Sequence, residues 1–212
     1  MSSELKIQYL GQSGFHLTMN GIGMLIDPSN KKSGDVDGAL LYCTHNHSDH
    51  IGGVTTYLER NENALFVANV QVLEKFPEFE DRSFAAVAGE TYTHDIWNLE
   101  FIEGKHGLFR GILNLGVIVR VGEHSFGHCG DTVTFQGFYD KKLDALAVPI
   151  SGAVTASPKK ALEELKKFQV RLPKIIPMHW LFRNPETFRE KFMSRSETVS
   201  CSVMRAGDTL TL

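Results

Sequence analysis

Cysteine is scarce in this sequence, and basic residues are not in excess. Three cysteines among 212 residues are too few for a disulfide framework, which favours a reducing compartment such as the cytoplasm. Lysine and arginine total 22 against 25 acidic residues, for a net charge of −3. This balance provides no basic surface for nucleic acid and argues against that partner.

Long apolar runs are also missing. No run approaches the roughly 18 residues that a membrane span needs, and residues 1–10 lack the charged and apolar segments of an export signal. The chain is therefore expected to be cytoplasmic and to act away from membranes.

The composition is that of an ordinary globular protein, with 42% hydrophobic and 22% charged residues. The length favours one domain over residues 1–212, because no linker, low-complexity tract or repeat divides it. Apolar runs bounded by glycine and polar turns predict strands at residues 7–10, 24–26, 39–43, 64–67, 112–121, 123–129, 143–149, 174–178, 199–204 and 209–212, and a hairpin that pairs residues 91–98 with 99–102. Helical spacing predicts helices at residues 51–61, 158–168 and 185–193, and a helical turn or two at residues 70–76.

Three of the nine histidines fall within six consecutive positions, at His45, His47 and His50, with Asp49 among them. Two imidazoles at i and i+2 after a strand can hold one metal ion, while the following aspartate and histidine turn toward a second site. Imidazole and carboxylate together suit Zn, Mn, Fe or Ni. The alternative is a solvated polar loop at the start of a helix.

Further ligand types follow other expected strands. His106 comes after residues 99–102, Asp131 after residues 123–129 and His179 after residues 174–178. Each alone could be a loop histidine, a turn aspartate or a capping histidine. Their shared placement beyond strand ends favours one metal site.

These residues resemble the metallo-β-lactamase-fold hydrolases over nearly the whole chain. The markers are residues 25–28, 44–53, His106, residues 130–132 and residues 177–179. Residues 11–15, and His128 ahead of Gly130, are most similar to the short branch that includes ascorbate-6-phosphate lactonase-like proteins. The resemblance implies an α/β fold: a four-layer αββα sandwich of two mixed β-sheets flanked by helices, with the metal site at one edge.

The same resemblance assigns ligands. They are His45, His47 and His106 for one ion, Asp49, His50 and His179 for a second, and Asp131 as a bridge. Asp27 is expected behind the ligands, orienting a histidine, with a turn role before Pro28 as the alternative. Related sequences in the branch often carry histidine where this chain has Gln12, so no role is inherited at that position.

Two divalent ions with this ligand set would keep a small positive charge. Paired ions lower the pKa of a shared water and polarise an electrophile. The resemblance thus implies a dinuclear hydrolase in which a bridging hydroxide attacks a carbonyl or phosphoryl centre of a small anionic substrate, such as a lactone or phosphoester. Asp49 and Asp131 would serve this catalysis, and Asp131 would orient the hydroxide. Zinc is expected first, with Mn, Fe or Ni as alternatives.

Other residues have weaker assignments. His128 is a candidate proton donor to the leaving group, with a packed structural histidine as the alternative. Cys129 is expected to be a buried thiol. Trp180 and Phe182 could line a pocket, although core positions are commoner for such aromatics.

Three other functions compete. One is a nuclease or cyclic-nucleotide phosphodiesterase of the same fold, and another is a non-catalytic metal-binding scaffold. A true β-lactamase is disfavoured, because Asp131 stands where many such enzymes use cysteine. Assembly into a homo-oligomer stays open.

Overall fold

The computed structural model describes residues 4–107, 111–194 and 199–212, in which two β-sheets face each other. The first sheet has the order β13-β1-β2-β3-β4-β5-β6. Its strands are β1 (Lys6–Gly11), β2 (Gly14–Met19), β3 (Ile22–Ile26), β4 (Leu40–Cys43), β5 (Leu65–Ala68), β6 (Ser83–Ala85) and β13 (Thr209–Thr211). The second sheet has the order β12-β11-β10-β9-β8-β7. Its strands are β7 (Thr91–His94), β8 (Trp97–Gly104), β9 (Asn114–Val121), β10 (His124–His128), β11 (Ala145–Pro149) and β12 (Lys174–Met178).

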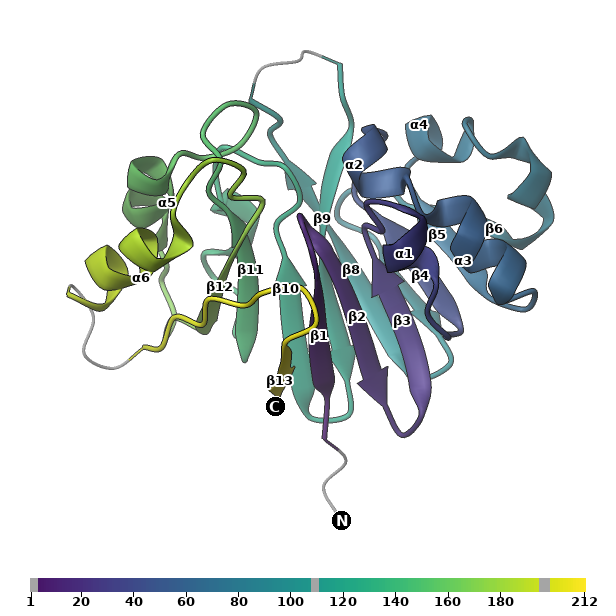
Figure 1. The fold of residues 1–212 in the computed structure, drawn as a ribbon, viewed down its shortest axis with the longest axis horizontal. Helices are drawn as coiled ribbons and strands as arrows, with labels where there is room; N and C mark the ends of the chain where they lie inside the picture. Colours follow the sequence, from purple (N-terminus) through teal and green to yellow (C-terminus); the bar gives the residue numbers. More distant parts are fainter. Residues whose placement is uncertain (1–3, 108–110, 195–198) are drawn as a thin grey trace.

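Helices cover the outer sides of the two sheets. They are α1 (Lys31–Gly34), α2 (Ser48–Ile51), α3 (Val54–Arg60), α4 (Val70–Leu73), α5 (Pro158–Leu165) and α6 (Pro185–Met193), with 3-10 turns η1 (Pro77–Arg82) and η2 (Gln136–Phe138). Helices α1 to α4 lie beside the first sheet, and α5 and α6 lie beside the second (Figure 1). The expected sandwich of two mixed sheets flanked by helices is confirmed. Among the described residues, no helix is long and apolar enough to cross a bilayer.

The main core fills the space between the sheets. Phe15 of β2 packs against Phe126 of β10 with ring centroids 5.3 Å apart. Tyr42 of β4 stacks on Phe101 of β8 at 5.8 Å. All four rings are buried, so aromatic packing across the sheets fixes how their edges face one another.

Strand direction brings several strand ends to one edge. Strands β3 to β6 are mutually parallel, as are β10 to β12. Strand β8 runs in the direction of β10, because both are antiparallel to β9. The carboxyl ends of β3, β4, β8, β10 and β12 therefore meet at one edge of the sandwich, and the residues just beyond them come together there.

Several element boundaries differ from those expected. A full strand, β2, lies between the two runs foreseen in residues 5–28. The helix expected at 51–61 is two helices, α2 and α3, interrupted at Gly52 and Gly53, and it begins earlier, at Ser48. Gly53 packs so closely on Asn30 that an added Cβ would lie 2.4 Å from its carbonyl oxygen. Close packing of α1 on this turn explains the break.

Helix α5 begins as expected and ends early. The Ser157 side chain accepts a hydrogen bond from the backbone N–H of Lys160, and Pro158 opens the helix. The helix stops at Leu165, so Phe168 lies outside it and packs edge-on against Tyr139.

Two other segments have different outcomes. The helical turn expected at residues 70–76 is confirmed as the short α4, which is followed by η1 and by strand β6, neither of which was expected. The strand at 199–204 is wrong, because only Cys201 pairs there, in a single bridge with Ile175. Two backbone hydrogen bonds to Ile175 hold that segment, which is too few for a strand.

Candidate metal centre

Seven histidine and aspartate side chains converge where the strand ends meet. His45 and His47 follow β4, and Asp49 and His50 lie in α2, which continues the same segment. His106 follows β8, Asp131 follows β10 and His179 follows β12. All seven ligands expected from the sequence therefore lie at one edge.

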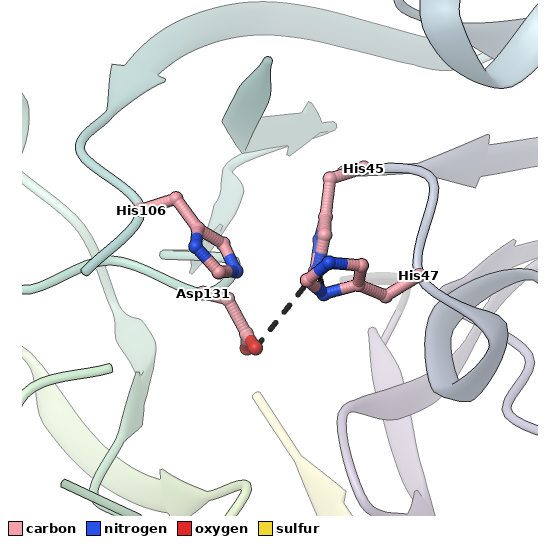
Figure 2. Close-up of side chains that lie close together, drawn as sticks. All are labelled: His45, His47, His106 and Asp131. Carbon is pink, nitrogen blue, oxygen red and sulfur yellow. Dashed lines mark hydrogen bonds and ion pairs between the residues drawn. The ribbon is translucent and has the colours of Figure 1, made fainter. Parts of the chain in front are cut away.

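The first group comprises three histidines and Asp131 (Figure 2). One ligand atom from each of His45, His47, His106 and Asp131 lies within 4.8 Å of the others. His45 Nε2 lies 3.0 Å from His47 Nδ1 and 3.9 Å from Asp131 Oδ2. Such a spread of ligand atoms can surround one ion.

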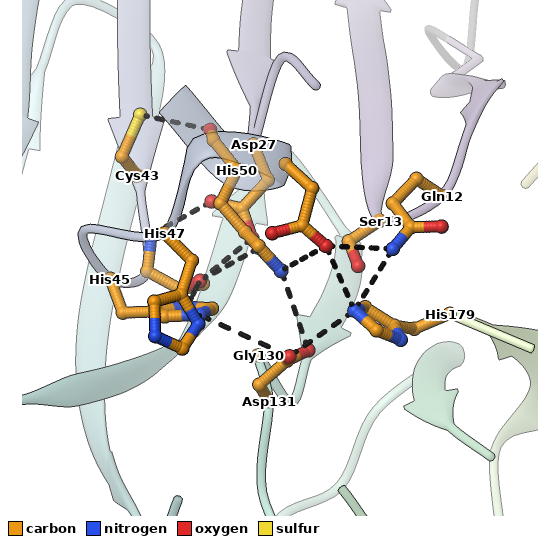
Figure 3. A network of polar contacts seen from close by, with 12 residues as sticks. Gln12, Ser13, Asp27, Cys43, His45, His47, His50, Gly130, Asp131 and His179 are labelled. Atoms are coloured by element: carbon orange, nitrogen blue, oxygen red, sulfur yellow. Dashed lines mark hydrogen bonds and ion pairs between the residues drawn. The ribbon is translucent and has the colours of Figure 1, made fainter. Parts of the chain in front are cut away.

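The second group comprises Asp49, His50 and His179, again with ligand atoms within 4.8 Å of one another. His179 Nε2 lies 3.2 Å from Asp49 Oδ2 and 3.2 Å from Asp131 Oδ2. His50 Nε2 lies 3.5 Å from Asp131 Oδ1. Asp131 therefore faces both groups, one oxygen toward His50 and the other toward His45 and His179 (Figure 3).

The donor set fits a cation. Nε2 of His50 and Oδ1 of Asp131 are buried and make no hydrogen bond of ordinary geometry among the described residues. Unsatisfied buried groups of this kind cost about 1–3 kcal/mol each. A cation held between them would remove that cost, and nitrogen and oxygen ligands suit Zn, Mn, Fe or Ni.

Electrostatics lead to the same conclusion. Burial, together with the neighbouring imidazoles, lowers the pKa of His45 well below its usual value, and burial also lowers the pKa of His47 and His106. The first group is thus held neutral, as metal-ligating imidazoles must be. Burial also acts to lower the pKa of His50, but Asp131 and Asp27 outweigh it and raise that pKa well above the usual value. Positive charge is favoured between these carboxylates.

Asp27 lies behind the second group, where an orienting carboxylate was expected. It is fully buried at the end of β3. Its carboxylate lies 2.7 Å from His50 Nδ1 and accepts hydrogen bonds from the N–H and hydroxyl of Thr44. This arrangement fixes the ring of a metal-facing histidine.

Asn114 holds Asp131 in place and was not identified from the sequence. Its Oδ1 accepts a hydrogen bond from the backbone N–H of Asp131 at 3.1 Å. The turn passes through Gly130, whose φ is +61°, and a Cβ there would lie 2.5 Å from Asn114 Oδ1. The glycine before Asp131 is visible in the sequence and indicates a tight turn there. No neighbouring residue in the sequence indicates the role of Asn114.

Thr132 holds the backbone just before His106 in place. Its hydroxyl accepts from the N–H of Lys105 at 3.0 Å and donates to the carbonyl of Thr134 at 2.9 Å. The loop after β10 is thereby tied to the loop after β8. This contact, like that of Asn114, joins segments far apart in the sequence.

His128 lies apart from the ligands. It is fully buried, its Nε2 lies 2.9 Å from the carbonyl of Ser13, and its Nδ1 accepts from the N–H of Gly130 at 3.1 Å. Both ring nitrogens are thus engaged by backbone, which corrects the proton-donor expectation in favour of the packed structural histidine. Cys129 is the buried thiol expected, and burial raises its pKa well above the usual value.

The aromatics after His179 take different places. Trp180 packs edge-on against Tyr9 at 5.7 Å, at the margin of the core. Phe182 is fully exposed, so a core position is wrong for it.

Gln12, to which no role was given, places its amide against the second group, 2.8 Å from Asp49 Oδ2.

Comparisons with known proteins agree with this architecture. Residues 6–179 match the family described as the beta-lactamase superfamily domain. A UPF0173 metal-dependent hydrolase of Bacillus cereus is 26% identical, with 98% of this chain and 100% of that protein covered.

Solved structures have the same fold. The metallo hydrolase Igni18 of Ignicoccus hospitalis has a TM-score of 0.83 and 24% identity, covering 99% of this chain and 98% of that one. The metallo-β-lactamase fold protein YhfI of Bacillus subtilis has a TM-score of 0.79 and 12% identity, covering 99% and 100%. None of these names specifies a substrate, so the lactonase-like branch stays a prediction.

Proposed function

The chain belongs to the beta-lactamase superfamily domain family, and on that premise we propose that it is a dinuclear hydrolase of a small anionic substrate, a lactone or a phosphoester. Metal-dependent hydrolysis is the coarser activity that the family and its relatives support. The number of ions and the substrate class are the proposal.

One observation carries the dinuclear assignment. Two separate groups of ligand atoms each lie within 4.8 Å, and Asp131 faces both. A single-ion site would not need Asp49, His50 and His179 in addition to a complete set of three histidines and a carboxylate. Two ions, with Zn expected first and Mn, Fe or Ni as alternatives, would use every member.

The charge of the site supports the substrate class. Two bound divalent ions supply a Lewis acid and lower the pKa of a water that they share. Asp49 and Asp131 are the anionic members of the ligand set and leave positive charge in excess. The Asp49 side chain is 44% exposed, whereas His50 and Asp131 are buried. An anionic oxygen would therefore approach from the side of Asp49.

The chain's own residues have defined tasks in this scheme. Burial keeps the imidazoles of His45, His47 and His106 neutral, so each can donate a lone pair to an ion. Asp131, fixed by Asn114, would orient the nucleophilic water between the two groups. Asp27 would keep the Nδ1 proton of His50, so that Nε2 faces the site.

Elemental mass spectrometry tests the proposal. Wild type and a His47→Ala/Asp131→Ala variant would be analysed for metal and assayed with lactone, phosphodiester and β-lactam substrates. We expect close to two ions per chain in wild type, and loss of both metal and one activity in the variant. Equal metal content in the two proteins, or none in wild type after Zn or Mn is added, would overturn the assignment in favour of a scaffold.

A further inference from the structure

Gln12 occupies a strained turn that is bonded to the strand end carrying His179. It lies between β1 and β2 with φ of +55°, a left-handed conformation that is uncommon for residues other than glycine. Its carbonyl accepts hydrogen bonds from the Tyr9 hydroxyl at 2.8 Å and from the backbone N–H of His179 at 2.7 Å. These two bonds hold the turn against the metal centre and fix where the Gln12 side chain begins.

The side chain of Gln12 reaches the second ligand group. Its Nε2 donates to Asp49 Oδ2 at 2.8 Å and lies 3.0 Å from His179 Nε2 (Figure 3). An amide nitrogen has two N–H donors and no acceptor. That nitrogen is therefore held against one atom of each of two proposed metal ligands, Asp49 and His179.

Metal binding changes what those donors can reach. His179 would use its Nε2 lone pair to hold an ion in the second group, and that nitrogen could then not accept a hydrogen bond from Gln12. Asp49 has further acceptor capacity and can keep its hydrogen bond. One N–H of Gln12 is then left beside the half-exposed carboxylate, on the side where a substrate would enter.

We propose that Gln12 is a catalytic residue that donates this N–H to an anionic oxygen of the substrate. This inference rests on the proposed function. An amide suits the task because it adds a hydrogen bond without adding charge. The matching ligand chemistry is a tetrahedral oxyanion, of which inorganic phosphate is the simplest probe.

The test compares Gln12→Met with wild type and with Gln8→Ala. Methionine retains the length of the side chain and the backbone bonds of position 12 but removes both donors. Gln8 lies in β1, the strand that precedes the Gln12 turn, and its amide is 3.4 Å from the carbonyl of Gly207, outside the site. Metal content would be measured for each protein. Calorimetry would then give the affinity of the metal-loaded forms for phosphate, and kcat/KM would be measured with whichever of the lactone, phosphodiester and β-lactam substrates wild type hydrolyses.

We expect all three proteins to hold the same metal, and Gln12→Met to bind phosphate about tenfold more weakly and to lose about tenfold or more in kcat/KM, as for one hydrogen bond to a charged group. Gln8→Ala should match wild type. Phosphate affinity and kcat/KM within twofold of wild type would overturn the inference. Loss of metal from Gln12→Met would also overturn it and make Gln12 a positioning residue. Absence of metal from wild type would instead be a failure of the proposed function. Gln12→Asn keeps an amide at this position and is the control that shows whether a loss of phosphate binding or activity reflects folding.

Discussion

Nδ1 of His50 lies 2.7 Å from Oδ2 of Asp27, and both side chains are fully buried. The carboxylate also accepts from the N–H and the hydroxyl of Thr44, at 2.8 and 2.7 Å. Three donors thus satisfy a charge that has no contact with solvent. The arrangement keeps the His50 proton on Nδ1 and leaves Nε2 for the site.

Replacing Asp27 by asparagine should weaken the second metal ion most. Asparagine has one acceptor oxygen where the carboxylate presents two, so it cannot accept from both the N–H of Thr44 and Nδ1 of His50. The ring is then oriented less firmly, and affinity for that ion should fall about 10- to 100-fold. Isothermal titration of metal-free protein with Zn or Mn measures this change. Asp37→Asn is the matched control, since the Asp37 side chain is 82% exposed and pairs with Arg60. Equal affinities for the two variants would contradict the prediction.

Glu164 stabilises the loop that follows Asp131. It is buried in α5 and accepts from the Thr134 hydroxyl at 2.7 Å and from the N–H of Phe135 at 3.1 Å. Lys160 and Lys167 pair with its other oxygen at 2.9 and 2.7 Å. Burial acts to raise the pKa of Glu164, but hydrogen bonds from the two lysines and from the hydroxyls of Tyr139 and Thr134 outweigh it and lower the pKa well below the usual value.

Glu164→Gln should therefore lower the free energy of unfolding at neutral pH, by about 1–3 kcal/mol. Because the pKa is lower in the folded than in the unfolded chain, the stabilisation is complete above the ordinary glutamate pKa of about 4.3 and fades as the pH falls below it. Urea unfolding of metal-free protein at pH 7 and pH 3.5 would show the gap between wild type and variant narrowing in acid. The control Glu163→Gln, at an exposed neighbour, should show no comparable difference from wild type in unfolding free energy. A difference between wild type and Glu164→Gln that increases in acid would refute the argument.

The ligand set could be predicted because its signals are local. His45, His47, Asp49 and His50 are close in sequence, and the remaining ligands each follow an apolar run that reads as a strand. Chain direction then brings the strand ends together. Few residue types bind metal ions. Several of them placed just beyond different strand ends therefore indicate a metal site, whereas one such residue after one strand does not.

The supporting contacts could not be predicted, because they depend on distant segments. Asn114 meets Asp131 across 17 positions, and Gln12 meets His179 across 167. No periodicity or spacing connects such residues. The sequence also overestimated the strand near Cys201, where hydrophobic character reflects packing on β12 rather than a ladder of hydrogen bonds.

Removing metal should lower thermal stability. An ion that binds only the folded chain stabilises it by about 2.7 kcal/mol when its free concentration is 100 times the dissociation constant. Differential scanning calorimetry with and without a chelator should therefore show a lower Tm in the chelated protein. His47→Ala/Asp131→Ala should be insensitive to the chelator, and a chelator response of wild-type size in this variant would place the stabilising ion elsewhere.

Gly130→Ala should remove metal as well as stability. Gly130 has a φ of +61°, and an added Cβ would lie 2.5 Å from Asn114 Oδ1, the atom that accepts from the N–H of Asp131. Gly21 is the matched control, because its φ is +81° but no atom lies within 4 Å of an added Cβ. Gly21→Ala should cost only the strain of a left-handed alanine, about 1–2 kcal/mol, and should keep its metal. Gly130→Ala should cost more in urea unfolding and contain less metal by elemental analysis, because relieving the clash displaces Asp131; equal metal in both variants would show that Asp131 tolerates movement of its turn.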